Sequence, residues 1–168
     1  MENVKTGPIT MGGQDGQCVS VVGDTYRILI TGKQTNGAFA TIDMFIPPGG
    51  GPGPHAHADF HESFFIIDGE IEVKSETGTY TATKGSYVVI PKGGVVHCFK
   101  NKTDKIAHML CMVAPAGLEE FFLEIGQPVA SGSFLPPPHM DPESLKKLLA
   151  IAERYGQKVF PPDYLDNI

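Results

Sequence analysis

Three histidines and a glutamate are placed where they could share a metal ion. His55 and His57 are separated by one residue, and Glu62 follows in the same segment, PHAHADFHE. Residues two apart on an extended strand project from the same face, so both imidazoles can reach one ion. A turn over residues 58–61 would let a neighbouring strand present Glu62 beside them. His97, in a later predicted strand, is the expected fourth ligand.

The type of donor indicates the class of ion. Three neutral imidazoles and one carboxylate suit a divalent first-row metal, and in octahedral geometry two positions stay open for substrate, water or dioxygen. We expect one divalent transition metal; iron, manganese, nickel, cobalt, copper and zinc are all compatible with these donors. Glu62 is also the expected catalytic residue, because a carboxylate beside a bound hydroxyl can accept its proton.

The other histidines have different expected roles. His61 neighbours Glu62 and should point to the opposite side of the strand, although contact with metal or substrate is left open. His108 lies in the last predicted strand, where a structural or pocket-lining role is favoured over metal ligation. His139, in the segment PPPHM, is expected to be a solvated side chain.

The elements that must position these residues are mainly strands. Glycine (20 residues) and proline (14) separate short β-branched and aromatic runs, a pattern typical of an all-β protein. The strands are predicted at residues 26–31, 38–46, 62–67, 71–75, 78–82, 87–90, 96–100 and 105–113. Asp68-Gly69 predicts a two-residue hairpin, and residues 76–78 predict the next turn.

The chain becomes helical after residue 113. Residues 117–126 have apolar side chains at helical spacing, and Asp141-Pro142 opens a second helix that ends at Gly156. A proline-rich segment lies between them. We expect residues 1–116 to form an N-terminal arm and a β-barrel. Residues 117–168 are expected to form a helical cap and tail of the same single domain.

Strand alternation predicts an apolar substrate pocket around the metal. Phe64 and Ile66, two and four residues after Glu62, should point to the same side of the barrel as Glu62. Phe99, two residues after His97, should point to the same side as His97. The first helix is expected to cover the barrel mouth together with the proline-rich segment. The expected pocket residues are Phe64, Ile66, Tyr87, Phe99, His108, Phe121 and Phe122.

Composition limits the partners. The chain of 168 residues has a formal charge of -6 and no basic stripe, so we expect a small-molecule substrate, no nucleic acid and no membrane. The first 13 residues lack the basic and apolar segments of a signal peptide. Cys18, Cys98 and Cys111 indicate neither a disulfide framework nor a thiolate zinc site. A cytoplasmic location is the expectation.

Two motifs closely resemble those of the cupin superfamily. The first is a glycine, five residues, HxH, four residues, glutamate, six residues and glycine, here Gly49, His55, His57, Glu62 and Gly69. The second family motif is a glycine, five residues, PxG, two residues, histidine, three residues and asparagine. Gly85, Pro91, Gly94, His97 and Asn101 are similar to it, but one residue more separates Pro91 from His97. The resemblance covers residues 20–115. It implies a jelly-roll-like antiparallel β-barrel with short C-terminal helices.

Within that superfamily the chain is most similar to single-domain bacterial quercetin 2,3-dioxygenase-like proteins. The tail segment LKKLLAIAERYGQKVFPP, residues 145–162, contributes to this similarity. The resemblance implies a homodimer and a metal-dependent dioxygenase that acts with dioxygen on a flavonol-like or other small enolic or aromatic substrate. Two alternatives remain: a metal-dependent isomerase or lyase of a small keto or sugar-like compound, and a non-catalytic small-molecule-binding cupin.

Overall fold

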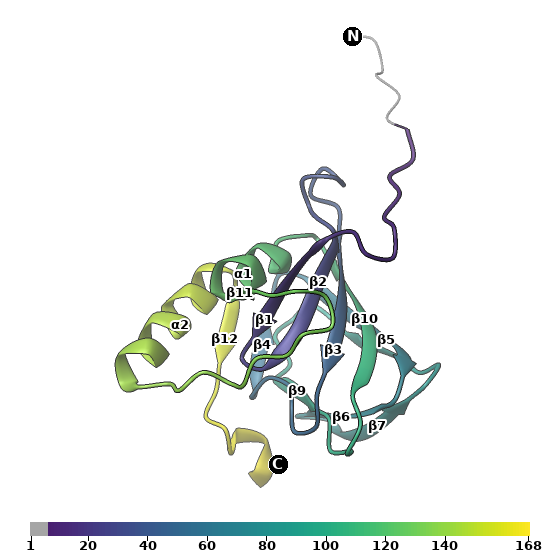
Figure 1. Ribbon diagram of the computed structural model, residues 1–168. Coiled ribbons are helices and arrows are strands. Elements are labelled where there is room, and N and C mark those ends of the chain that lie inside the picture. Colours follow the sequence, from purple (N-terminus) through teal and green to yellow (C-terminus); the bar gives the residue numbers. More distant parts are fainter. Residues whose placement is uncertain (1–6) are drawn as a thin grey trace.

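Two antiparallel β-sheets enclose the core of the protein in a computed structural model that describes residues 7–168 (Figure 1). The seven-stranded sheet has the order β11-β1-β2-β3-β10-β5-β8, and the five-stranded sheet has the order β12-β4-β9-β6-β7. The strands of the first sheet are β1 (Gln17–Val21), β2 (Asp24–Ile30), β3 (Ala40–Ile46), β5 (His61–Asp68), β8 (Tyr87–Ile90), β10 (Ala107–Ala114) and β11 (Gln127–Pro128). Those of the second are β4 (His55–His57), β6 (Glu70–Ser75), β7 (Gly78–Thr83), β9 (His97–Lys100) and β12 (Gln157–Val159).

The predicted all-β fold is confirmed, and alternation along the strands explains it. In β5, Glu62, Phe64 and Ile66 are buried, whereas Phe65 between them is 41% exposed. Each of the eight predicted strands overlaps an observed one. Strands β1, β4, β11 and β12 are not among the eight predicted ranges. The inward side chains of both sheets form one apolar core, so the barrel is closed by packing between its sheets.

One predicted turn is wrong and another is confirmed. Strands β5 and β6 do not pair across Asp68-Gly69, because they belong to different sheets. Gly69 has a φ of 80° and lies at the corner where the chain changes sheet; a Cβ there would come within 3.0 Å of the Ala107 Cα. The turn after Ser75 does join a hairpin, in which Ser75 pairs with Gly78 between β6 and β7.

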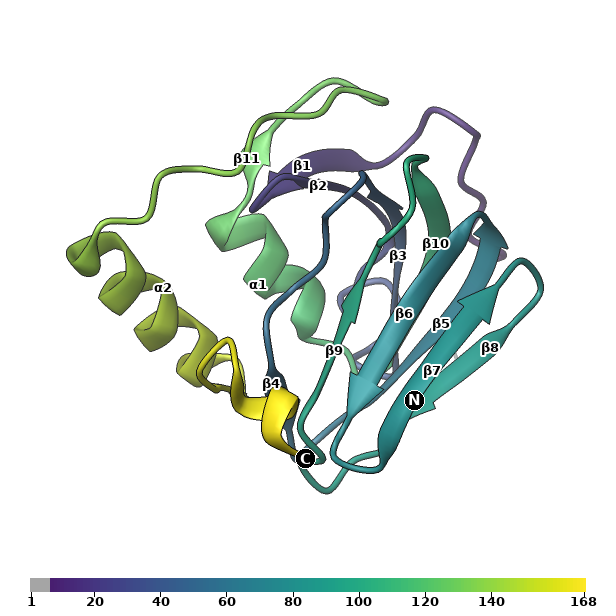
Figure 2. The same cartoon turned by 90° about the horizontal axis from the view of Figure 1, so that it is seen from below.

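Two helices lie beside the barrel (Figure 2). Helix α1 spans Leu118–Ile125, and α2 spans Pro142–Arg154, where Asp141 caps the start by accepting a hydrogen bond from the Ser144 amide at 2.7 Å. A 3-10 helix, η1 (Tyr164–Asn167), ends the chain. None of the helices within residues 7–168 has the length and apolar character of a membrane-spanning segment. The start of the predicted N-terminal arm, residues 1–6, lies outside the described residues.

The C-terminal tail completes the five-stranded sheet next to β4. Strand β12 pairs with β4, with Gln157 opposite His57 and Val159 opposite His55. Leu165 of η1 is buried against Ala56 and Val96. The strand that carries HxH is therefore held between β9 and the tail.

The outer face of the seven-stranded sheet carries exposed apolar side chains. Phe65, Tyr87, Val89 and Met112 are each more than a third exposed. The homodimer stays a prediction.

Asn101 connects the loop after β9 to the end of β3. Its fully buried amide donates to the Ile46 and Lys105 carbonyls at 2.8 and 2.6 Å, and its oxygen accepts from the Thr103 amide at 3.0 Å. We expect Asn101→Ala to lower the free energy of unfolding by about 2–3 kcal/mol, because these buried partners lose their hydrogen bonds. Urea unfolding measures this. A loss below about 0.5 kcal/mol, as expected for the exposed-site control Gln127→Ala, would contradict the assigned role.

Candidate metal centre

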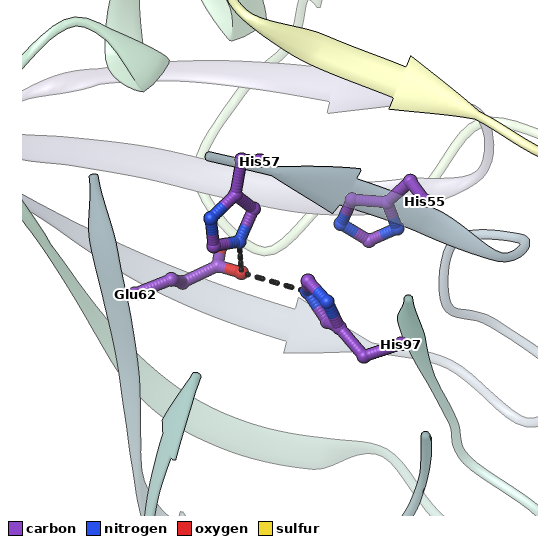
Figure 3. Close-up of side chains that lie close together, drawn as sticks. All are labelled: His55, His57, Glu62 and His97. Carbon is purple, nitrogen blue, oxygen red and sulfur yellow. Dashed lines mark hydrogen bonds and ion pairs between the residues drawn. The ribbon is translucent and has the colours of Figure 1, made fainter. Parts of the chain in front are cut away.

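Four side chains from three strands converge inside the barrel (Figure 3). His55 and His57 come from β4, and His97 of β9 is the direct cross-strand partner of His55. Glu62 comes from β5 in the opposite sheet, so the cluster spans the barrel interior. One donor atom from each residue lies within 4.8 Å of the others, and all four residues are buried. The four-residue cluster could hold one metal ion.

The backbone fixes the tautomer of each imidazole. The Nδ1 atoms of His55, His57 and His97 lie 2.9, 3.1 and 3.0 Å from the carbonyl oxygens of Gly53, Phe60 and Val95. A carbonyl only accepts, so each Nδ1 must carry the proton and donate. The Nε2 atom of each neutral ring is therefore left with a free lone pair, as in metal-binding histidines oriented by a second hydrogen bond.

Two of these lone pairs, those of His57 and His97, face the Glu62 carboxylate, an arrangement that fits a cation. Glu62 Oε2 lies 3.3 Å from His57 Nε2 and 3.4 Å from His97 Nε2. A neutral ring that is protonated at Nδ1 has no proton on Nε2 and cannot donate a hydrogen bond from that atom. The Nε2 atoms and the carboxylate oxygen, all of them acceptors, therefore face one another. His97 Nε2 is buried without a hydrogen-bond partner. A divalent ion between these atoms would satisfy all four, and the donor set thus fits a transition metal.

Burial and hydrogen bonding set the charges of His55 and Glu62. Burial, reinforced by nearby His97, lowers the pKa of His55 to about 4, so this ring is neutral near pH 7. Burial alone would raise the pKa of Glu62, but hydrogen bonds that His57 and His97 donate whenever they carry a second proton outweigh it and hold the pKa of that carboxyl well below its usual range, so Glu62 is ionised. A metal would therefore meet a neutral imidazole at His55 and an ionised carboxylate at Glu62, the forms that bind metals.

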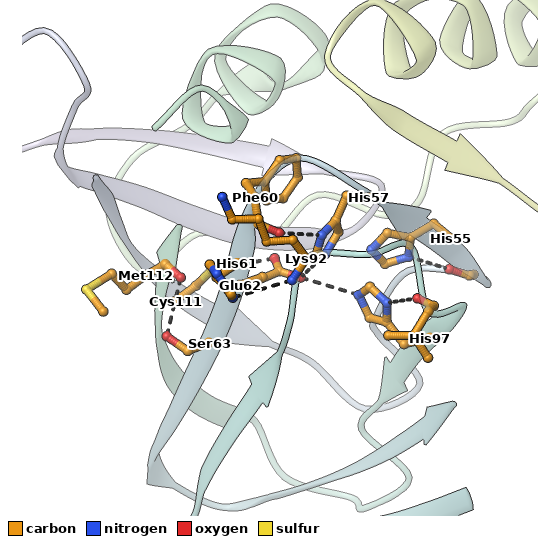
Figure 4. Close-up of polar contacts among 12 residues, drawn as sticks. His55, His57, Phe60, His61, Glu62, Ser63, Lys92, His97, Cys111 and Met112 are labelled. Atoms are coloured by element: carbon orange, nitrogen blue, oxygen red, sulfur yellow. Dashed lines mark hydrogen bonds and ion pairs between the residues drawn. The ribbon is translucent and has the colours of Figure 1, made fainter. Parts of the chain in front are cut away.

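Neighbouring side chains orient the cluster (Figure 4). The Cys111 thiol donates to Glu62 Oε1 at 3.6 Å, and the Phe60 ring stacks on His57 with centroids 4.1 Å apart. His61 is exposed, and its Nδ1 accepts a hydrogen bond from the Lys92 amide at 3.4 Å. His61 therefore lies on the other side of β5 from Glu62, as alternation predicts.

A cavity of about 240 Å³ opens beside the cluster. His55 and Glu62 line it at the metal end. Its other walls are mostly apolar and come largely from the two helices: α1 contributes Leu118, Phe121, Phe122 and Ile125, and α2 contributes Leu145, Leu148, Leu149 and Ala152. Such a cavity suits a small ligand with an apolar body.

The predicted pocket residues divide into three groups. Phe99, Phe121 and Phe122 line the cavity. Phe64 and Ile66 point inward but are packed in the core, 1% and 0% exposed. Two further predicted pocket residues, described next, lie on the outside of the barrel.

Tyr87 and His108 point away from the cavity. Tyr87 pairs with the outward-facing Phe65 and is 58% exposed. His108 stacks on Phe45, and its Nε2 lies 2.5 Å from Asp43 Oδ1 on the outer face of β3 and β10. The inward side of β10 is occupied by Met109, Cys111 and Val113, which leaves His108 no place in the pocket. Residues 134–137 of the proline-rich segment do not line this cavity; they line a second, adjoining one together with residues 47–51.

Sequence reasoning missed three polar residues of the cavity: Asp24, Tyr26 and Gln157. Asp24 is buried; it accepts from the Tyr26 hydroxyl at 3.0 Å and from the Gly51 amide at 3.3 Å. Burial outweighs these hydrogen bonds and raises the pKa of Asp24 to about 7. Nothing in the spacing of Asp24 relates it to the histidines, and its burial cannot be read from the sequence.

This raised pKa predicts that Asp24→Asn stabilises the protein at neutral pH. A carboxyl with a folded pKa near 7 contributes stability when protonated, and that contribution is lost as pH rises from about 4 through 7. Asparagine has the same shape and does not ionise. We expect the variant to gain about 2–4 kcal/mol over the parent at pH 8 and almost nothing near pH 4. Thermal melts across this range measure the difference, and a pH-independent difference would refute the assignment.

Part of the chain matches a known protein family. A family model described as "Cupin domain" matches residues 42–113, which include all four residues of the cluster. Quercetin 2,3-dioxygenase of Bacillus subtilis (strain 168) is 22% identical over 157 residues, which are 92% of this chain and 45% of that relative. The chain thus spans less than half the length of this curated relative.

Solved structures agree on the fold. KdgF from Halomonas sp. superposes with a TM-score of 0.56 at 15% identity, over 66% of this chain and 94% of that one. Ectoine synthase from P. lautus gives 0.55 at 22% identity, over 80% and 95%. Together with the match over residues 42–113 and the two-sheet barrel, they show that the chain has the cupin fold.

Proposed function

We propose that the protein is a metal-dependent dioxygenase acting on a flavonol-like or other small enolic or aromatic compound. The observation that carries the proposal is the cluster of three imidazoles and a carboxylate opening directly onto an apolar, partly aromatic cavity. The relative from Bacillus subtilis, named a quercetin 2,3-dioxygenase, supports the same substrate class.

The residues of the chain have separable roles in this reaction. His55, His57, Glu62 and His97 would hold the metal. When bound, the metal supplies Lewis acidity that lowers the pKa of a coordinated substrate hydroxyl. The Glu62 carboxylate is ionised and accepts the hydroxyl proton, while the Cys111 thiol holds its other oxygen. Phe99, Phe121 and Phe122 pack against the substrate ring and exclude water from the reacting atoms.

Oxygen consumption tests this function. The protein would be loaded separately with iron, manganese, cobalt, nickel, copper and zinc, and oxygen uptake followed with flavonols and related enols. We expect uptake that requires both substrate and metal and that rises in proportion to metal content. Fully loaded protein that consumes no oxygen with any of these compounds would rule out the dioxygenase.

A proton-transfer enzyme, a metal-dependent isomerase or lyase of a keto compound, is the second candidate. Asp24 favours it: this buried carboxyl lines the cavity, and its pKa of about 7 suits a group that both accepts and donates a proton near neutral pH. Such an enzyme would exchange substrate protons with D2O without using oxygen. NMR in D2O therefore separates the two candidates.

A further inference from the structure

The amide of Gln157 is a buried donor without a partner. Among the buried side-chain nitrogen and oxygen atoms of the described residues, two lack a hydrogen bond: His97 Nε2 and Gln157 Nε2. The first belongs to the metal cluster, where an ion would satisfy it. Gln157 lines the cavity next to this cluster and is 9% exposed. A buried donor left unpaired is costly, so a second missing partner at the same place indicates a ligand.

The sheet places Gln157 on the metal side of β4. Gln157 lies directly opposite His57 in the antiparallel pair of β12 and β4. Directly opposite residues point to the same face of a sheet, so Gln157 faces the barrel interior with the histidines. Gln157, His55 and Glu62 line the same cavity, so a ligand that fills this cavity can contact both the cluster and the amide.

The lining of the cavity limits the chemistry of that ligand. Asp24 and Glu62 are its acidic residues, and no lysine or arginine occurs among the described residues that line it. An anionic body such as a phosphate or a sugar acid would therefore have no cationic side chain to pair with. The leucines and phenylalanines of α1 and α2 favour an apolar ring system.

We propose that Gln157 is a substrate-recognition residue that donates a hydrogen bond to a carbonyl oxygen of a neutral ring compound, whose hydroxyl points to the metal cluster. This inference rests on the proposed function for the location of the substrate. It adds that the substrate carries a carbonyl oxygen as well as the hydroxyl that points to the metal cluster. A site built to donate to a carbonyl discriminates against the analogue that lacks it, because the donor then stays unpaired.

Binding to the zinc-loaded protein tests the proposal without turnover. The probes are the 5-, 6- and 7-hydroxy isomers of 1-tetralone, and the two phenolic tetrahydronaphthols, which have the same rings and hydroxyl but no carbonyl. We expect at least one hydroxytetralone to bind the parent protein more tightly than the tetrahydronaphthols. Gln157→Leu should weaken that binding about tenfold and leave tetrahydronaphthol binding unchanged. NMR titration measures both affinities.

Matched variants separate recognition from folding. Gln157→Glu keeps the shape but removes the donor, so it should lose the same affinity as Gln157→Leu. Gln127→Leu makes the same change at an exposed position and should have no effect. Melting temperature and zinc content verify that each variant is folded and loaded. Equal weakening of both probe classes by Gln157→Leu, or no preference of the parent protein for any ketone, would overturn the proposal.

The proposed function can fail independently of this inference. Carbonyl-selective binding that depends on Gln157, without oxygen uptake on any flavonol or enol, would remove the dioxygenase and keep the recognition residue. Oxygen uptake together with equal binding of the ketones and the tetrahydronaphthols would keep the dioxygenase and remove Gln157 as a recognition residue.

Discussion

Replacing His97 with alanine is expected to lower the affinity for a divalent metal by at least about 100-fold. His97 stands directly opposite His55, and its Nε2 is a buried atom that lacks a hydrogen bond. Removing this ring deletes one of four donors and leaves a gap between the sheets. Changes to groups that merely orient a ligand already cost 10–100-fold, so loss of the ligand itself should cost more. Competition titration with a chromophoric chelator measures the affinity.

A second histidine provides the control for this variant. His139 lies in the proline-rich segment and is exposed, so His139→Ala should bind metal like the parent protein. The folded state of His97→Ala must be verified by circular dichroism. Folded His97→Ala with the metal affinity of the parent would mean that the ion is held elsewhere.

Replacing Glu62 with glutamine should separate metal binding from catalysis. The three imidazoles remain, so the variant is expected to retain metal at reduced occupancy. The amide cannot accept the substrate proton, and turnover per bound metal should fall by about 10²–10⁴-fold. Single-turnover assays, normalised to metal content, measure this. Undiminished turnover would rule out the acid-base role.

The control for Glu62 is an exposed glutamate near the cavity. Glu120 lies on α1 and is exposed, and Glu120→Gln removes the same charge without touching the cluster. Its turnover should equal that of the parent. An equal loss in both variants would indicate a general effect of charge and not proton transfer by Glu62.

The candidate site was easier to predict than the pairing of the strands around it, because HxH and the following glutamate lie within a few residues of one another in the sequence. Spacing alone places His55 and His57 on one face, and the cross-strand pairing with His97 then requires only that β4 and β9 be neighbours. Asp68-Gly69 shows the opposite case. A strong local turn signal was present, but pairing with β10 and β8 keeps β5 in the other sheet, and no local pattern reports that choice.

The uncertain side-chain direction along a strand explains why two predicted pocket residues lie on the outer face of the barrel. Strand β10 has the sequence AHMLCMVA, which is apolar on both faces, so the sequence alone does not say which side His108 takes. The side of Tyr87 depends on its register with Phe65 across β5 and β8. Strand β1 was missed for another reason: Val22, a β-branched residue with a φ of 51°, forms the turn after it, and valine does not signal such a turn.

The cavity polar groups were missed because they come from distant parts of the chain. Asp24 lies in β2 and Gln157 in β12, and Gln157 meets the histidines only after the tail has paired with β4. Neither has a spacing relation to HxH. Such residues become visible when burial and missing hydrogen bonds are known.

X-ray absorption spectroscopy of the metal-loaded protein tests the central claim most directly. We predict one divalent ion per chain with three imidazole nitrogens and at least one oxygen in its coordination sphere, and loss of one imidazole in His97→Ala. A chain that retains no ion from any of the six metals, or an ion without imidazole ligands, would contradict the metal centre and the functions proposed for it.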